Sequence, residues 1–186
     1  MTSAFFRRSV HEIAPQLIGV ELLVDGVGGV IVEVEAYDHD DPASHAYLNR
    51  RTKRNGSMFL EGGHAYVYRS YGIHWCLNFV CGDVGVADAV LVRALEPTRG
   101  IEEMRRRRGV DDSRLLCAGP GRLCQALGVT GALDGLALDR APFALAPTEV
   151  AFDVVTSPRI GLTKAVDRQW RYTARDSRFL SRPARA

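Results

Sequence analysis

Two carboxylates and a tyrosine alternate with small apolar residues at the end of an apolar stretch, and this pattern suggests chemistry. Side chains two residues apart on a β-strand point to the same side of the sheet, so Glu33, Glu35 and Tyr37 share one face. They follow the apolar run 30–32, and charged residues are rarely buried without partners. Three interpretations of Glu35 are open: a catalytic carboxylate, a solvent-facing strand residue, or half of an ion pair with Arg93.

Arg93 lies inside the apolar part of a second predicted strand, residues 87–96. A single arginine among apolar strand residues either has a buried anionic partner or reaches a ligand. The sequence alone favours neither alternative.

A β-hairpin is predicted from two alternating segments, His64–Arg69 and Ile73–Val80, joined by Ser70-Tyr71-Gly72. This places Tyr71 at the tip of the hairpin, where a bulky aromatic side chain has no core to pack in. A basic segment precedes the hairpin, and an aromatic tip beside basic residues suggests a wedge inserted between stacked bases. The basic residues are Arg50, Arg51, Lys53 and Arg54.

Five of the six tyrosines lie in this part of the chain, and those at positions 37, 66, 68 and 71 form the aromatic set considered for the site. Such residues usually pack within a core or across paired strands. Their grouping with a carboxylate, a hairpin tip and a basic segment favours a functional site between Gly28 and Asn78.

A metal site is a weaker alternative. His39 and His45, with neighbouring aspartates, are possible ligands by type, but their spacing matches no recognised ligand motif. The four cysteines show no C-x-x-C spacing and are expected to be reduced and buried.

The composition is that of an ordinary globular protein: 186 residues, 46% hydrophobic and 25% charged, with a net charge of +2. This length fits one domain spanning residues 1–186, with a frayed tail from about residue 182. The N-terminal residues lack the apolar core of a signal peptide, and no apolar run reaches membrane-spanning length. We expect a cytoplasmic protein without membrane contact.

The remaining predicted elements alternate between strands and helices. Ser9 is expected to cap a helix that Pro15 kinks or shortens, and Asp112 or Ser113 to cap another. Strands are predicted at 20–24, 30–37 and 150–155, and helices from Pro97 to Gly109 and over 122–127.

Taken together, the motifs make the chain resemble the alkyladenine (3-methyladenine) DNA glycosylase family, the compact type found in mammals and bacteria. The resemblance runs in order from about Phe5 to Ser181. Its matching segments are IVEVEAY followed by SHA, RTKRN-x-x-MF, YVYRSYGIHWCLN, VLVRALEPTRGIEEM, GPGRLCQALGV and RIGLTKAVDRQWRY.

The resemblance implies a base-excision repair enzyme that flips an alkylated or deaminated purine from duplex DNA and hydrolyses its N-glycosidic bond. It implies no metal, no cofactor and no lyase step. The implied catalytic residues are Glu35, which activates a water, and Arg93, which helps to hold it. The implied base-binding residues are Tyr37, His45, Tyr68 and Asn78, and the DNA-contacting residues are Tyr71 and Ile73 with the basic residues Arg50, Arg51, Lys53 and Arg54.

The resemblance and the predicted elements together indicate an α+β fold. We expect one compact domain with a curved, mostly antiparallel sheet, flanking helices and a protruding β-hairpin. The chain is expected to act as a monomer on double-stranded DNA carrying a damaged purine, associated with the nucleoid if bacterial.

Three features depart from the family pattern. Asn49–Asn55 lacks two glycines and a proline, Ile73 stands where methionine is frequent, and Pro15 falls in the first helix. Two other functions stay open: a non-catalytic binder of damaged or distorted DNA, and a metal-dependent hydrolase that uses His39 and His45.

Overall fold

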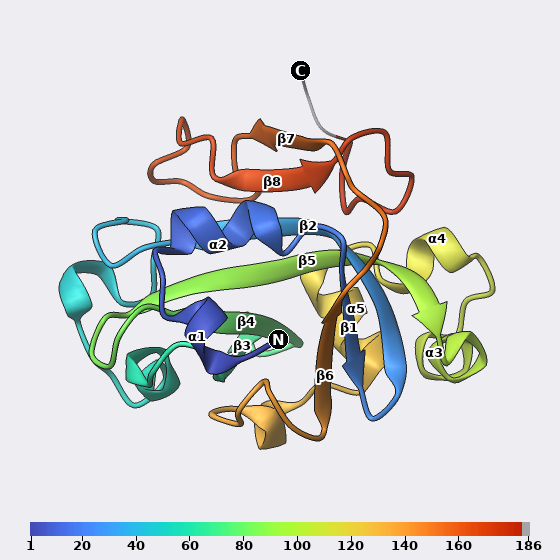
Figure 1. Ribbon diagram of the computed structural model, residues 1–186, viewed down its shortest axis with the longest axis horizontal. Helices are drawn as coiled ribbons and strands as arrows, with labels where there is room; N and C mark the ends of the chain where they lie inside the picture. The colour runs from blue at the N-terminus through green and yellow to red at the C-terminus, as the bar shows by residue number, and fades with distance from the viewer. Residues whose placement is uncertain (184–186) are drawn as a thin grey trace.

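The longest strands of the chain, β2 (Val27–Tyr37) and β5 (Asp88–Arg99), pair side by side and form the centre of the sheet. The computed structural model describes residues 1–183 (Figure 1). Most side chains of both strands are buried, which explains why their sequences read as nearly continuous apolar runs.

Eight strands form one antiparallel sheet in the order β3-β4-β5-β2-β1-β6, and β8 joins it by pairing with β2. The first half of β2 pairs with β1, while Glu33–Glu35 pairs with β8. The sheet therefore divides along one edge of β2, and β8 passes directly beside the two glutamates. The other strands are β1 (Val20–Val24), β3 (Ala65–Ser70), β4 (His74–Cys81), β6 (Phe143–Pro147), β7 (Val154–Ser157) and β8 (Arg171–Ala174).

Helices cover the sheet at several places (Figure 1). Helix α2 (Val10–Gln16) packs on β2 and β5, while α5 (Pro120–Leu127) packs on β4 and β5 and contacts α3 (Ile101–Arg108). The remaining short helices are α1 (Ser3–Phe6), α4 (Ser113–Leu116), η1 (Tyr47–Asn49), η2 (Gly56–Phe59) and η3 (Gly131–Leu133).

The expected fold is confirmed: one compact α+β domain with a mostly antiparallel sheet. The strand at 20–24 has the predicted bounds, and the hairpin is shifted by one residue. Ser9 caps α2, which ends one residue after Pro15, and Asp112 caps α4. Helix α5 begins at Pro120, two residues before the predicted start.

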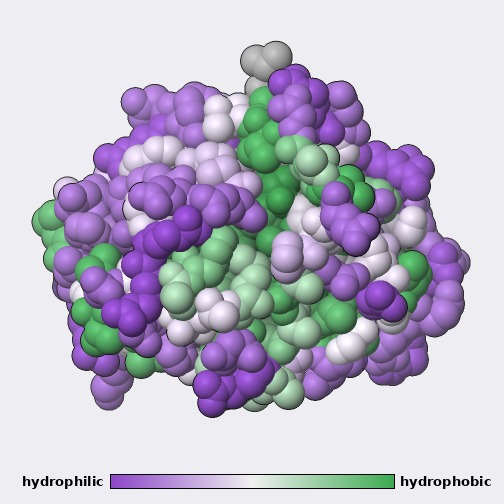
Figure 2. All heavy atoms as spheres, in the orientation of Figure 1, coloured by the Kyte–Doolittle hydropathy of each residue, from purple (hydrophilic) through white to green (hydrophobic). Residues whose placement is uncertain are grey.

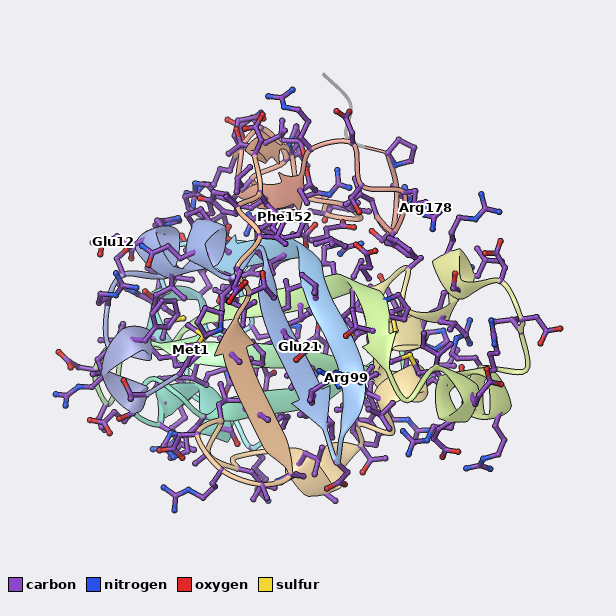
Figure 3. The ribbon with its side chains drawn as sticks, turned by 45° about the vertical axis from the view of Figure 1, so that its right-hand side comes forward. Met1, Glu12, Glu21, Arg99, Phe152 and Arg178 are labelled. Atoms are coloured by element: carbon purple, nitrogen blue, oxygen red, sulfur yellow. The ribbon has the colours of Figure 1, made fainter. Side chains whose placement is uncertain are left out.

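The helix predicted from Pro97 is wrong at its start. Residues 97–99 extend β5, because Pro97 and Arg99 pair with the glycines of β2. The side chains of Thr98 and Arg99 both contact Glu21 on β1, and Figure 3 shows Glu21 and Arg99 on the same part of the sheet. Helix α3 therefore begins at Ile101, after Gly100 with a φ of 66°.

The elements near the C-terminus were predicted less well than the others. The strand predicted at 150–155 lies instead at Val154–Ser157, and neither β6 nor β8 was predicted. The tail expected to fray begins at about Arg182, whose carbonyl accepts a hydrogen bond from Arg171 at 2.5 Å. Residues 184–186 of the predicted tail lie outside the described residues.

The surface seen in the orientation of Figure 1 is mostly hydrophilic, with apolar residues gathered along its middle (Figure 2). Within residues 1–183, every helix is too short or too polar to cross a bilayer.

Gly28 and Gly29 of β2 allow β1 and β5 to approach β2 closely. An added Cβ at Gly29 would lie 2.0 Å from the main-chain oxygen of Glu96, which no backbone tolerates. We expect Gly29→Ala to reduce the free energy of unfolding by more than about 3 kcal/mol in urea titrations. Gly56→Ala is the control, because an added Cβ there meets nothing within 4 Å. Equal stability of the two variants would contradict this packing.

Candidate active site

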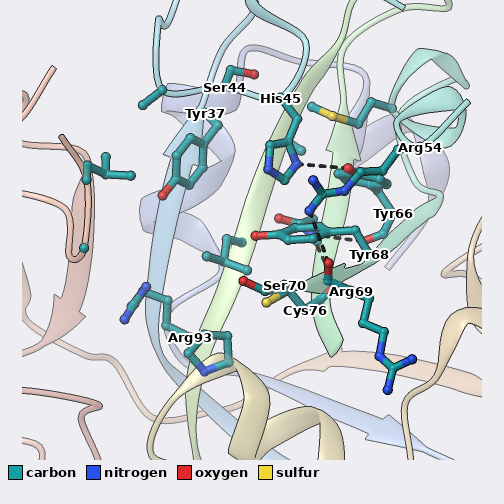
Figure 4. A pocket seen from close by; sticks show the side chains of 18 of the residues that line it. Tyr37, Ser44, His45, Arg54, Tyr66, Tyr68, Arg69, Ser70, Cys76 and Arg93 are labelled. Carbon is teal, nitrogen blue, oxygen red and sulfur yellow. Dashed lines mark hydrogen bonds between the residues drawn. The ribbon is translucent and has the colours of Figure 1, made fainter. Parts of the chain in front are cut away.

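A cavity of about 710 Å³ opens between β2, the β3–β4 hairpin, the loop before η1 and residues 160–162. Figure 4 shows Tyr37 on one side of it, His45, Tyr68 and Arg54 on the other, and Arg93 at one end. A cavity of this size holds a purine nucleoside. Its lining includes all four residues expected to bind the base, Tyr37, His45, Tyr68 and Asn78, together with Arg93, which was expected to be catalytic.

The Glu35 carboxylate lies directly behind this wall and has no exposed surface. Oε2 accepts hydrogen bonds from the Tyr37 hydroxyl at 2.8 Å and from Arg93 Nη1 at 3.2 Å. Oε1 accepts one from the main-chain N–H of Ile160 at 2.8 Å. Three groups that line the cavity therefore hold the carboxylate in one orientation.

Arg93 joins Glu35 to the second carboxylate of the strand. Its Nε donates to Glu33 Oε1 at 3.0 Å, so one guanidinium bridges both glutamates. Burial disfavours the charged form of Arg93, but the attraction of Glu35 and Glu33 outweighs it and raises the pKa. Arg93 therefore has the buried anionic partners of the first alternative, and it also lines the cavity.

Glu33 is fully buried and is held by several donors besides Arg93. Arg171 Nε donates to it at 2.8 Å, and Ser181 donates through its main-chain N–H at 2.6 Å and its hydroxyl at 2.7 Å. Glu33 thus fixes Arg93 and anchors β8 and the C-terminal segment to the strand that carries Glu35.

Tyr37 forms one wall of the cavity, and its hydroxyl remains a donor. Burial, followed by the nearby charge of Glu35, raises the pKa of Tyr37 far above its ordinary range. The guanidinium of Arg159 lies 4.4 Å from the centre of its ring, between Tyr37 and Trp170. Arg159 also pairs with Asp41, so it connects this wall to the loop that carries His45.

The facing wall consists of three rings. The centroids of His45 and Tyr68 are 4.5 Å apart, and those of Tyr66 and Tyr68 are 5.4 Å apart in a stacked arrangement. His45 Nδ1 lies 3.0 Å from the Tyr66 hydroxyl. Burial lowers the pKa of His45 to about 4, and the charge of Arg54 acts in the same direction, so the imidazole is neutral at pH 7.

Asn78 is fixed in place by the hairpin itself. Its Nδ2 donates to the main-chain oxygens of Tyr66 at 3.0 Å and Cys76 at 3.4 Å. Both amide hydrogens are therefore used inside the protein, and the side chain has little freedom to move away from a ligand.

The hairpin tip has a backbone conformation that turns Tyr71 outward. Tyr71 and Gly72 have φ values of 50° and 69°, as in a type I′ turn, and Ile73 N donates to Ser70 O. A tyrosine with positive φ is strained, and such strain is typical of functional sites. Tyr71 is 92% exposed and Ile73 is 67% exposed, so neither contributes to the core.

The basic residues of the 50–54 segment do not act as one group. All four are exposed, and Arg50, Arg51 and Lys53 lie outside the cavity lining. Arg54 instead lines the cavity, with its guanidinium 5.0 Å from the centre of the Tyr68 ring. The buried side chain of Asn55 shapes this loop by bonding to Thr52 N and to the carbonyls of His45 and Arg50.

A second basic cluster, the four arginines at 105–108 on α3, forms contacts within the protein. Glu102 and Glu103 pair with Arg105, Arg106 and Arg107 on the same helix. Arg108 donates to the carbonyl of Leu116. These contacts tie α3 to the following helices.

The sequence did not assign the wall formed by Ile160, Gly161 and Leu162. The segment RIGL belongs to one of the matching motifs, but only folding brings it next to Glu35. Two arginines, Arg159 and Arg171, are at least as buried as Arg93. The available signal was an arginine between two aromatic residues at Arg171, and for Arg159 only its place in the RIGL segment.

The proposed metal ligands are used in other contacts. His39 bonds to Asp88, Asp41 pairs with Arg159, and His45 contacts Tyr66. Within residues 1–183, no group of three or more His, Cys, Asp or Glu side chains could hold a metal ion. The donor arrangement of the metal-hydrolase alternative is therefore not present in the described part of the chain.

Comparison with known proteins places these features in a family, because residues 4–178 match the family model of methylpurine-DNA glycosylase. The chain belongs to the methylpurine-DNA glycosylase family. It is therefore a DNA glycosylase, an enzyme that hydrolyses N-glycosidic bonds in DNA and serves base-excision repair.

Bacterial relatives match nearly the whole chain, and each is provisionally named a 3-methyladenine DNA glycosylase. A protein of Rhodopseudomonas palustris (strain HaA2) is 62% identical over 96% of this chain and 89% of its own length. One of Nitrobacter winogradskyi is 60% identical over 100% of this chain and 89% of its own length. One of Nitrosospira multiformis is 56% identical over 97% of this chain and 93% of its own length.

The lowered pKa of His45 gives a prediction for stability. Between pH 6.5 and about 4 the unfolded chain binds a proton at His45 that the folded protein does not. This contribution to the free energy of unfolding is therefore present above pH 6.5 and is lost as the pH falls toward 4. We expect His45→Gln to show a shallower decline of stability over this window in urea titrations. Parallel profiles for wild type and variant would contradict the assignment.

Proposed function

We propose that the glycosylase removes an alkylated or deaminated purine that is flipped into the cavity, and that Glu35 activates the attacking water. The observation that carries this proposal is the position of the Glu35 carboxylate, held by Tyr37, Arg93 and Ile160 directly behind a purine-sized cavity. A carboxylate fixed in this way is a preorganised general base.

The hydrogen bonds of Glu35 leave room for one more donor. A carboxylate offers about four acceptor positions, and Tyr37, Arg93 and Ile160 occupy three of them. The fourth position, on Oε1, is the one that a water would use. Because Glu35 has no exposed surface, that water must be admitted between the side chains of the cavity wall.

The proposed reaction is a displacement at the sugar. The water oxygen bonds to C1′ and gives its proton to Glu35, while the bond from C1′ to the purine nitrogen breaks and its electron pair leaves with the base. Positive charge develops on the sugar in an oxocarbenium-like transition state, and the negative charge of Glu35 stabilises it. Arg93 positions Glu35 and maintains its orientation.

The aromatic walls would hold the flipped base by stacking. Tyr37 faces His45 and Tyr68 across the cavity, as Figure 4 shows, and flat rings on both sides suit a planar purine. Asn78, fixed by two hydrogen bonds, would meet the exocyclic amine of guanine and disfavour that base.

The outer residues would hold the duplex around the flipped nucleotide. Tyr71 at the strained tip would fill the space left in the base stack, with Ile73 beside it. Arg50, Arg51 and Lys53 are exposed and would contact phosphates. We further propose that the enzyme acts as a monomer, in the cytoplasm and on nucleoid DNA.

The test of this function is base release by Glu35→Gln. We expect wild type to release hypoxanthine, ethenoadenine or a methylated purine from duplex DNA in the presence of EDTA. Glu35→Gln should lose at least about 10³-fold in single-turnover rate, within the range for removal of a general base. DNA binding by the variant, measured by fluorescence anisotropy, should persist.

The non-catalytic binder of damaged DNA, which the sequence left open, conflicts with membership in a family of DNA glycosylases. Tight binding by wild type and Glu35→Gln without release of any base would establish that function instead. Release that stops in EDTA would indicate a metal-dependent reaction.

The wedge gives a separate prediction. Tyr71→Ala should slow base release from duplex DNA by at least about tenfold. Without the tyrosine side chain in the stack, the flipped base returns to its place in the duplex more readily. The same lesion in single-stranded DNA needs no extrusion from a stack, so its release should change little. An equal loss on both substrates would contradict the role of a wedge.

A further inference from the structure

We propose that Arg54 stabilises negative charge on the departing purine, and that it thereby favours excision of neutral damaged bases over cationic ones. This inference rests on the function proposed above and concerns the leaving group rather than the attacking water. It separates Arg54 from the other basic residues of its loop.

The first observation is the place of the guanidinium. Arg54 lines the cavity on the side of His45 and Tyr68, and its Nη2 donates to the main-chain oxygen of Arg69 at 3.2 Å (Figure 4). Three residues earlier, Arg51 lies 5.4 Å from the ring of Phe59, which is not part of the cavity lining. Only one of these two arginines can therefore meet a base in the cavity.

The second observation is that Arg54, an exposed residue at the edge of the cavity, forms no ion pair with a carboxylate among residues 1–183. Among residues 1–183, its guanidinium meets an aromatic ring and a carbonyl. Arg93, by contrast, is paired with two glutamates. The positive charge of Arg54 acts within the site, because burial first and this charge second lower the pKa of His45.

The chemistry of the leaving group makes this charge selective. When the glycosidic bond of a neutral base such as hypoxanthine breaks, the electron pair leaves with the base, which becomes an anion until water protonates it. A base methylated on N7 or N3 is already cationic in DNA and leaves neutral. A fixed positive charge beside the base therefore assists the departure of a neutral base, which leaves as an anion. It adds little to the departure of a cationic base, which leaves neutral.

The same charge opposes binding of a cationic base before the reaction. Tyr37 and Tyr68 each already have a guanidinium near the ring, from Arg159 at 4.4 Å and Arg54 at 5.0 Å. Aromatic faces that already contact a cation have less attraction left for a cationic base.

The experiment compares single-turnover release of hypoxanthine and of 7-methylguanine or 3-methyladenine from duplex DNA, with enzyme in excess. We expect Arg54→Met to slow hypoxanthine release by about tenfold or more, and release of the cationic base by less than about threefold. Arg54→Lys, which keeps the charge, should fall between wild type and Arg54→Met for hypoxanthine.

Arg51→Met is the matched control, because it removes the same charge from the same loop outside the cavity. It should weaken binding to both substrates alike and leave the ratio of their rates unchanged. Equal slowing of both bases by Arg54→Met would show a purely structural role and overturn the proposal, as would no slowing of either. Absence of release by wild type would instead refute the proposed function itself.

Discussion

The alternation of charge from Glu33 through Arg93 to Glu35 is the interaction on which the rest of the site depends. All three groups are buried, and removing one partner from such an arrangement leaves an uncompensated charge in a medium of low dielectric constant. The pairing of β2 with β5 brings the arginine opposite the two carboxylates. The sheet thus positions the Glu35 carboxylate through Glu33, a second residue of the same strand, which holds Arg93.

This charge arrangement also determines where distant segments lie. Arg171 on β8 and Ser181 near the C-terminus both donate to Glu33, and Ile160 donates to Glu35. The cavity wall formed by residues 160–162 is therefore held against β2 by the same groups that orient the carboxylate. Arg159 and Asp41 extend this connection to the loop that carries His45.

Local sequence patterns predicted the strands and the turn that depend on local interactions. The period-two alternation identified β2 and the hairpin, and the Ser70–Gly72 turn correctly placed Tyr71 at an exposed tip. The cavity also brings together the four residues that the family resemblance selected for base binding. Their roles stay predictions until the variants are measured.

Non-local packing accounts for most of what the sequence did not predict. Pro97 reads as the start of a helix, but pairing with the glycines of β2 extends the strand instead. The strand β8 is only four residues long and carries Arg171, whose partner Glu33 lies 138 positions away. Arg54 reads as one of four loop cations, and only the fold separates it from Arg51.

A double-mutant cycle on single-turnover base release tests most directly whether Glu35 and Arg93 act as one unit. The rates of Glu35→Gln, Arg93→Lys and the double variant would be compared with wild type on the same lesion. If Arg93 acts by positioning Glu35, the double variant should be no slower than Glu35→Gln alone. If the two losses multiply, Arg93 acts independently of Glu35, and a positioning role for the arginine is contradicted.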